Sequence, residues 1–249
     1  MKLLSVESVS CHFGSLIAVD KVSMDVEAGE LRAIIGPNGA GKTTFFNLIS
    51  GMLQPTTGRI LFDGNDITNR SARQRVALGM ARTFQITEIF PELTVRENVR
   101  TPVEIAAGLR LFPFMPGGVE AKIRSRLDEL LAIGGLTKIA DRLAGELSHG
   151  DQRSTEIMMA LALRPRLLLL DEPTAGMGEE ETFAVTQLIR RLHKETSMTI
   201  VLIEHDMRVV FRLADRITVL DQGKSLAEGT PPEISANAAV QAAYLGKAA

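Results

Sequence analysis

The stretch that decides the fold reads Gly36-Pro37-Asn38-Gly39-Ala40-Gly41-Lys42-Thr43-Thr44. It fits the pattern G-x-x-x-x-G-K-S/T of the phosphate-binding P-loop. An apolar run at 31–35 predicts a buried strand before the loop, and residues 43–49 predict a helix after it. Glycines allow successive N–H groups to turn towards a phosphate, and a helix N-terminus adds partial positive charge there. The alternative is a glycine-rich turn with a structural role only.

Two side chains at the end of this loop have predicted contacts with a bound nucleotide. Lys42 is expected to reach the β- and γ-phosphates, and the Thr43 hydroxyl is expected to bind Mg²⁺. The loop positions expected to surround the phosphates are Gly36, Pro37, Asn38, Gly39, Ala40, Gly41 and Thr44.

Composition and charge exclude several classes of function. The chain has 249 residues, enough for a large core, and its 28 basic and 30 acidic residues nearly balance, so nothing indicates a nucleic-acid surface. Arg70, Arg73, Arg75 and Arg82 form a mild basic cluster, which we interpret as a solvated helix face. The single cysteine, Cys11, rules out an intramolecular disulfide and fits a reducing compartment.

No segment of the sequence is predicted to cross a membrane. The densest apolar run, at 167–170, is far shorter than the roughly 18 residues that a spanning helix requires. The first residues reach Glu7 too early for a secretory signal. We expect a soluble protein, whose membrane role would come through a partner.

The N-terminal region predicts short strands and the C-terminal region a parallel sheet. Val6, Val9 and Cys11 suggest an edge strand, and residues 17–26 and 58–64 predict two more strands. Further apolar runs, which alternate with amphipathic helices, are typical of a parallel sheet covered on both faces. They lie at 167–170 and 199–203, and a closing hairpin is predicted at 217–229.

A helical insertion is predicted between the two halves of this core. Its clearest sign is a set of apolar residues at helical spacing, namely Ile123, Leu127, Leu130 and Leu131. We therefore expect a single domain with a nucleotide-binding core at 1–86 and 164–249 and a helical subdomain at 87–163.

Two carboxylates end the apolar run at 167–170. Side chains at the carboxyl end of a buried strand face the crevice where ligands bind in open α/β sheets. Asp171 is expected to hold Mg²⁺ through water, and Glu172 is expected to accept a proton from the attacking water. The alternative is a pair of acids that only ends a strand at the surface.

Three further residues are candidates for contacts with a nucleotide bound at the phosphate loop. His205 follows the strand at 199–203, where it could donate a hydrogen bond to the γ-phosphate. Gln85 is a neutral amide able to bind Mg²⁺ or the attacking water, and Phe13 could stack on adenine. The alternatives are a structural histidine and a core phenylalanine.

Residues 147–151 predict a second anion site. Ser148 is a good N-cap for the helical run that follows, and Gly150 leaves the backbone accessible. An ordinary helix cap is the alternative.

Taken in this order, these residues resemble the ATP-binding subunit of ABC transporters, over essentially the whole chain. Residues 36–44 resemble the Walker A loop, residues 167–172 the Walker B strand with its catalytic glutamate, and residues 147–151 the signature loop. Gln85 matches the Q-loop glutamine and His205 the H-loop histidine.

The resemblance implies a fold, a cofactor and a reaction. The fold is an α/β P-loop NTPase core of the RecA-like type, with an N-terminal antiparallel β lobe and an inserted α-helical subdomain. ATP and Mg²⁺ are the implied cofactors, with Phe13 against adenine and with Ser148 and Gly150 on the γ-phosphate. The implied activity is ATP hydrolysis coupled to transport.

Two motifs depart from the family pattern. The signature loop has His149 where a glycine is usual and Asp151 where a glutamine is usual, and Gln152 comes one place late. The D-loop ends in Gly178 where an aspartate is frequent, so communication across a dimer is expected to differ. We expect hydrolysis to survive both changes.

Five short stretches look like one of the two ATPases of branched-chain amino-acid importers. They are residues 82–85, 93–99, 150–153, 203–207 and the ending Ala243-Tyr244-Leu245-Gly246. This implies a peripheral location on the cytoplasmic face of a bacterial or archaeal membrane. The implied partners are a second ATPase in a homodimer or heterodimer, two transmembrane permeases and an external substrate-binding protein, with no nucleic acid. Relatives in this branch carry urea, amides or aromatic acids, so the solute stays open.

Other members of the family offer alternatives. An ATPase of a lipid or polysaccharide exporter would share the same core, whereas a soluble ABC ATPase would carry a long coiled coil or two cassettes. An inactive regulatory subunit would be expected to lose Lys42 or Glu172, and both are present. The apolar loops at 86–93 and 112–116 are expected either to contact a permease or to pack locally.

Overall fold

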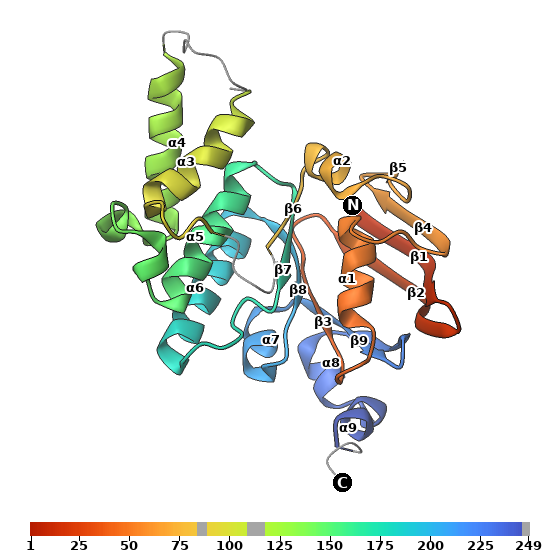
Figure 1. Cartoon of the computed structure of the whole chain (residues 1–249). Coiled ribbons are helices and arrows are strands. Elements are labelled where there is room, and N and C mark those ends of the chain that lie inside the picture. Colours follow the sequence, from red (N-terminus) through yellow and green to blue (C-terminus); the bar gives the residue numbers. More distant parts are fainter. Residues whose placement is uncertain (84–88, 109–117, 246–249) are drawn as a thin grey trace. The chain divides into compact units, whose positions relative to one another are not determined.

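The computed structural model describes residues 1–83, 89–108 and 118–245 (Figure 1). By its internal contacts the chain divides into two compact units, residues 1–80 with 192–249 and residues 81–191. Among the described residues, no helix combines the length and apolar character needed to cross a membrane.

The first unit contains an antiparallel sheet of four strands in the order β2-β1-β4-β5. Its strands are β1 (Lys2–Phe13), β2 (Leu16–Glu27), β4 (Thr57–Phe62) and β5 (Asn65–Asp66). The predicted edge position of β1 is wrong, because β1 pairs with β2 on one side and with β4 on the other. Val6 and Val9, which are fully buried, lie on either side of a register shift in the pairing with β2.

The same unit contains strands of a second sheet, in which β3 (Leu31–Ile35) lies between β8 (Thr199–Ile203) and β9 (Arg216–Asp221). Both neighbours run parallel to β3, and β10 (Lys224–Gly229) closes the hairpin antiparallel to β9. Every residue of β3 and β8 is buried, which accounts for their largely apolar sequence. The charged exception is Arg32 of β3, which is 2% exposed and donates through Nε to Glu30 at 2.6 Å. The predicted parallel strands and the closing hairpin are confirmed.

Helix α1 (Lys42–Ser50) follows the phosphate loop, and a buried arginine from α2 (Ala72–Ala77) caps its far end. Arg75 is 1% exposed, and its Nη1 donates to the carbonyl oxygens of Leu48 and Ile49 at 2.7 Å each. The interpretation of the basic cluster as a solvated face is therefore wrong for Arg75, because it binds the last carbonyls of α1. Arg70 and Arg73 are exposed, as expected.

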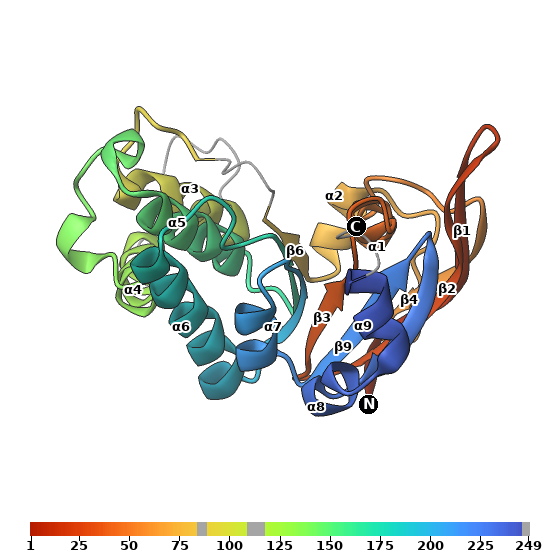
Figure 2. The same ribbon diagram turned by 90° about the horizontal axis from the view of Figure 1, so that it is seen from below.

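The first unit also contains three short helices. The first is α7 (Met207–Leu213), which precedes β9; α8 (Pro231–Ser235) and α9 (Ala238–Leu245) follow β10 in the sequence and end the unit (Figure 2). Both α8 and α9 contact β10.

The second unit is mainly helical. Helices α3 (Val95–Ala106), α4 (Val119–Ile133) and α5 (His149–Ala162) pack against one another (Figure 1), with the short 3-10 turns η1 (Thr137–Ile139) and η2 (Ala144–Glu146) between α4 and α5. The four apolar residues predicted on one face of α4 are all buried. Thr94 and Glu97 form a capping box at the start of α3, which fixes where that helix begins.

The second unit also holds β7 (Leu167–Asp171) and most of β6 (Met80–Arg82), which is its neighbour in the sheet order. The Thr83 N–H donates to the Leu169 carbonyl at 2.9 Å and ties the end of β6 to β7. Helix α6 (Glu179–Thr196) begins in this unit and continues into the other. The predicted strand at 167–170 is confirmed, whereas the predicted boundaries of the subdomain at 87–163 stay a prediction.

Candidate nucleotide site

The phosphate loop connects β3 to α1 in a conformation that requires glycine. Gly36 has φ +154°, and a Cβ there would lie 2.1 Å from the Leu220 carbonyl oxygen. Gly41 is the N-cap of α1 in the left-handed conformation, and no side chain caps the helix. The N–H groups of the first turn of α1 therefore face the loop, as the P-loop pattern predicts.

Lys42 is held inside this loop by its own backbone. The side chain is buried, with 6% exposed, and its Nζ donates to the carbonyl oxygens of Gly36 at 2.7 Å and Pro37 at 3.0 Å. Thr43, the next residue, is exposed. The ammonium group is thus fixed at the loop, where it can donate to an anion, and the Thr43 hydroxyl is accessible to a cation.

A pocket of about 390 Å³ lies against the phosphate loop within the first unit. It is lined by Gly36, Pro37, Asn38, His205 and Tyr244. The structure thus brings His205 to the loop, as the sequence predicts, and its ring is exposed. The buried Glu204 holds the turn at this position, since its Oε2 accepts from the His205 N–H at 2.9 Å.

Phe13 ends β1 with half of its surface exposed, at 50%. The alternative that it is a core residue is therefore wrong. Gln85 and residues 86–88 of the apolar loop at 86–93 lie outside the described residues, as does the loop at 112–116. Phe90, at the described end of the first loop, is 52% exposed.

The acid pair lies in the second unit at the end of β7. Asp171 is buried, and Arg82 from β6 donates through Nη2 to its Oδ2 at 2.7 Å. Arg82 is 10% exposed in its side chain, so the solvated interpretation of the basic cluster is wrong for this residue too. The expected juxtaposition of Asp171 with Lys42 stays a prediction.

Glu172 follows Asp171 in an uncommon backbone conformation. It is buried and has φ +45°, which is sparsely populated by residues other than glycine. Such backbone strain is frequent at functional sites because the surrounding structure must hold it in place.

Ser148 caps α5, and a glutamate from α6 binds the start of the same helix. Ser148 Oγ accepts from the Asp151 N–H at 3.2 Å, so the predicted N-cap is confirmed. The Glu181 carboxylate accepts from the Gly150 N–H at 3.1 Å and from the Gly178 N–H at 3.3 Å. These backbone hydrogen bonds hold the pKa of Glu181 below its usual value, because they stabilise the charged carboxylate. The hydrogen bond from Gly150 has the largest effect.

Sequence reasoning missed Glu181. The available signal is an acidic residue at the third position of a helix, where a carboxylate can accept from the N–H of the residue that precedes the helix. Its second partner, Gly150, is 31 residues earlier in the chain, and no local sequence pattern predicts this contact.

Comparison with known proteins identifies the family. The ABC transporter family model matches residues 19–175, and the model described as branched-chain amino acid ATP-binding cassette transporter matches residues 224–249. This chain is an ATP-binding member of the ABC transporter family. It is similar to BraF of Pseudomonas aeruginosa, at 40% identity over 99% of this chain and 98% of BraF, and to LivG of Escherichia coli, at 39% over the same shares.

A solved structure supports the same assignment. The ADP conformation of an ABC transporter ATP-binding cassette superposes with a TM-score of 0.86 at 32% identity, over 99% of both chains. The predicted fold class, a P-loop NTPase of ABC type, is confirmed.

Two of the departures from the ABC pattern have visible local consequences. The Gln152 amide, one place later than the usual glutamine, donates back to the carbonyl oxygens of Ala144 and Leu147 at 3.2 Å each. Gly178, in place of the frequent aspartate, contributes its N–H to Glu181. The Glu181 carboxylate thus accepts a hydrogen bond from a backbone N–H of the D-loop.

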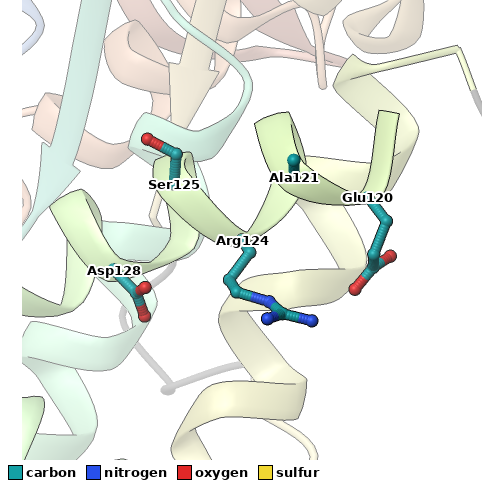
Figure 3. A pocket seen from close by; sticks show the side chains of 5 residues that line it. All are labelled: Glu120, Ala121, Arg124, Ser125 and Asp128. Atoms are coloured by element: carbon teal, nitrogen blue, oxygen red, sulfur yellow. The ribbon is translucent and has the colours of Figure 1, made fainter. Parts of the chain in front are cut away.

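A second hollow, of about 620 Å³, lies along α4 in the helical unit (Figure 3). Figure 3 shows Arg124 between Glu120 and Asp128 along the helix, with Ala121 and Ser125 completing the lining. Two of the five lining residues carry carboxylates, whose negative charge disfavours a phosphate. This hollow is therefore unsuited to a nucleotide.

Proposed function

We propose that this chain is the ATP-hydrolysing subunit of an importer that takes up branched-chain amino acids across the cytoplasmic membrane. One observation carries the proposal: a buried lysine lies in a phosphate loop at a helix N-terminus, in a chain whose residues 224–249 match the branched-chain family. BraF and LivG are named high-affinity branched-chain amino acid transport ATP-binding proteins. These names favour amino-acid transport over the lipid, polysaccharide and non-transport alternatives.

Phosphate binding falls to the loop and the start of α1. The Lys42 ammonium, which donates to two carbonyl oxygens of the loop, is placed to donate to β- and γ-phosphate oxygens as well. The remaining contacts come from the loop at residues 36–44 and from the helix N-terminus. The half-exposed ring of Phe13 offers a face on which adenine can stack.

Hydrolysis requires a base and stabilisation of the developing charge. We assign Glu172 as the base that takes a proton from the attacking water, and His205 as a donor to the γ-phosphate. Thr43, Asp171 and Gln85 offer the oxygen ligands that Mg²⁺ prefers, and Mg²⁺ supplies charge neutralisation on the phosphates when bound.

The complete site is expected to need two subunits. Ser148 and Gly150 of one subunit would contact the γ-phosphate held by the Walker A loop of the other, so ATP joins the subunits and hydrolysis lets them part. The second subunit is the same chain or a sibling ATPase. Two permeases would dock near Gln85 and the helical subdomain at 87–163, on the cytoplasmic face of the membrane, and an external binding protein would deliver the solute.

Uptake of labelled leucine by the host tests the proposal. Lys42→Ala at its own locus is expected to abolish saturable uptake, whereas Lys138→Ala, an exposed lysine of η1, should leave it unchanged. Unchanged uptake with Lys42→Ala present at a normal level would remove leucine as the cargo, and urea, amides and aromatic acids would be tested next.

Purified protein tests the assignment of the base. Glu172→Gln should retain ATP binding while turnover falls by about 10²–10⁴-fold, the contribution typical of a positioned proton acceptor. Turnover at the wild-type rate would contradict the assignment of Glu172.

A further inference from the structure

The end of the chain carries a tyrosine back to the phosphate loop. After β10, α8 and α9 fold against the first unit (Figure 2), and Val240, 5% exposed, anchors α9 there. Asn237 fixes the start of α9, since its Oδ1 accepts from the Val240 N–H at 3.1 Å. One turn after Val240, Tyr244 lines the pocket that also contains Gly36 and His205.

Tyr244 and Lys42 hold opposite ends of the same glycine. The Tyr244 oxygen accepts a hydrogen bond from the Gly36 backbone, and the Gly36 carbonyl accepts from Lys42 Nζ at 2.7 Å. Gly36 also packs so closely against Leu220 that a Cβ would not fit. Gly36 therefore helps to fix the Lys42 ammonium, together with the Pro37 carbonyl.

The phenol suits a site for anions because it stays neutral. Burial raises the pKa of Tyr244 to about 12, although the Gly36 hydrogen bond acts in the opposite direction. A neutral hydroxyl accepts from Gly36 and keeps its own hydrogen as a donor. It therefore adds no negative charge beside the expected phosphates.

We propose that Tyr244 is a positioning residue for the nucleotide phosphates: by holding Gly36 it fixes the phosphate loop and the Lys42 ammonium. The inference rests on the proposed function, in that the loop is taken to bind ATP. It gives a role to the C-terminal segment, whose residues 224–249 match the branched-chain family model. The C-terminal helix of the chain thus becomes part of the nucleotide site.

Equilibrium titration with MgATP tests the inference on the full chain. Tyr244→Phe keeps the ring but loses the oxygen, and we expect MgATP affinity to fall about threefold to tenfold, the change equivalent to one ordinary hydrogen bond. Gln241→Ala is the matched control, because it removes a hydrogen bond of the same helix to the Ser235 carbonyl, at an exposed position. Its affinity for MgATP should equal that of the wild type.

A second readout follows Tyr244 itself. The chain has one tyrosine and no tryptophan, so its intrinsic emission comes from Tyr244 and should change when MgATP saturates the wild type, with Tyr244→Phe as the blank. Wild-type binding with unaffected affinity in Tyr244→Phe, or with unaltered tyrosine emission, would overturn the inference alone. Failure of the wild type to bind MgATP would overturn the proposed function together with it. If Tyr244→Phe does not fold, the wild-type emission decides.

Discussion

Replacing Arg82 by methionine is expected to destabilise the second unit by about 3–5 kcal/mol, because it leaves the Asp171 carboxylate buried without its guanidinium partner. The two side chains are 10% and 5% exposed, and the Nη2–Oδ2 distance is 2.7 Å. Water cannot reach the carboxylate well enough to replace the lost hydrogen bond. The loss is a large fraction of the roughly 5–15 kcal/mol that stabilises a typical domain.

A double-mutant cycle isolates the contribution of the pair. Asp171→Asn removes the opposite charge, and the double variant Arg82→Met with Asp171→Asn should be less destabilised than the sum of the two single changes. We expect a coupling free energy of about 1–3 kcal/mol. Urea unfolding followed by circular dichroism measures it, and urea is preferable because it carries no charge that would screen the pair.

An exposed ion pair in the same chain provides the control. Arg59 and Glu7 approach to 2.9 Å, but their side chains are 66% and 42% exposed. A cycle with Arg59→Met and Glu7→Gln should therefore give a coupling below about 1 kcal/mol. Equal coupling in the two cycles would refute the reasoning that burial decides the strength of the Arg82 pair.

Three further outcomes follow from the geometry of the first unit. Gly36→Ala should abolish measurable ATP binding in an equilibrium titration, because its Cβ would lie 2.1 Å from a carbonyl oxygen, whereas Gly39→Ala meets nothing within 4 Å and should cost only about 1–2 kcal/mol of backbone strain. Equal loss in both would contradict the steric reasoning. Phe46→Ala, at a fully buried position of α1, should lower the free energy of unfolding by about 3–5 kcal/mol in urea, and a loss below about 1 kcal/mol would contradict its place in the core. Tyr244, with a pKa of about 12 in the folded protein against about 10 in the unfolded chain, should show phenolate absorbance only at the higher pH. Since the unfolded state ionises first, stability should fall between about pH 10 and 12 and not depend on Tyr244 below that range, and identical titrations in native and urea-unfolded protein would contradict the burial of the phenol.

The parts of the fold that could be predicted depend on local sequence. The sequences of β3, β7 and β8 are largely apolar because those strands are buried throughout, and the glycines of the loop at 36–44 indicate its backbone conformation. The apolar spacing in α4 likewise reports the face that the helix buries. In each case the residues of the segment itself are sufficient to predict its structure.

The parts that could not be predicted depend on distant partners. The interior position of β1 follows from its pairing with β4, which comes more than 40 residues later in the chain. Arg75 and Arg82 belong to a cluster that looks solvated, yet Arg75 is buried and Arg82 is only 10% exposed, because carbonyl or carboxylate oxygens from other segments accept their hydrogen bonds. Glu181 is recognisable as a helix-capping residue, but its contact with Gly150 appears only in three dimensions.

Arg75 caps the C-terminal end of α1 by donating hydrogen bonds to two of its last carbonyl groups. The last carbonyl groups of a helix usually turn to water, and the last turn then opens and closes independently of the rest. In α1 the carbonyl oxygens of Leu48 and Ile49 share one buried cation from α2, so opening that turn would strip the cation of two partners. We therefore expect the last turn of α1 to open only together with α2, so that its amide hydrogens exchange slowly with deuterium.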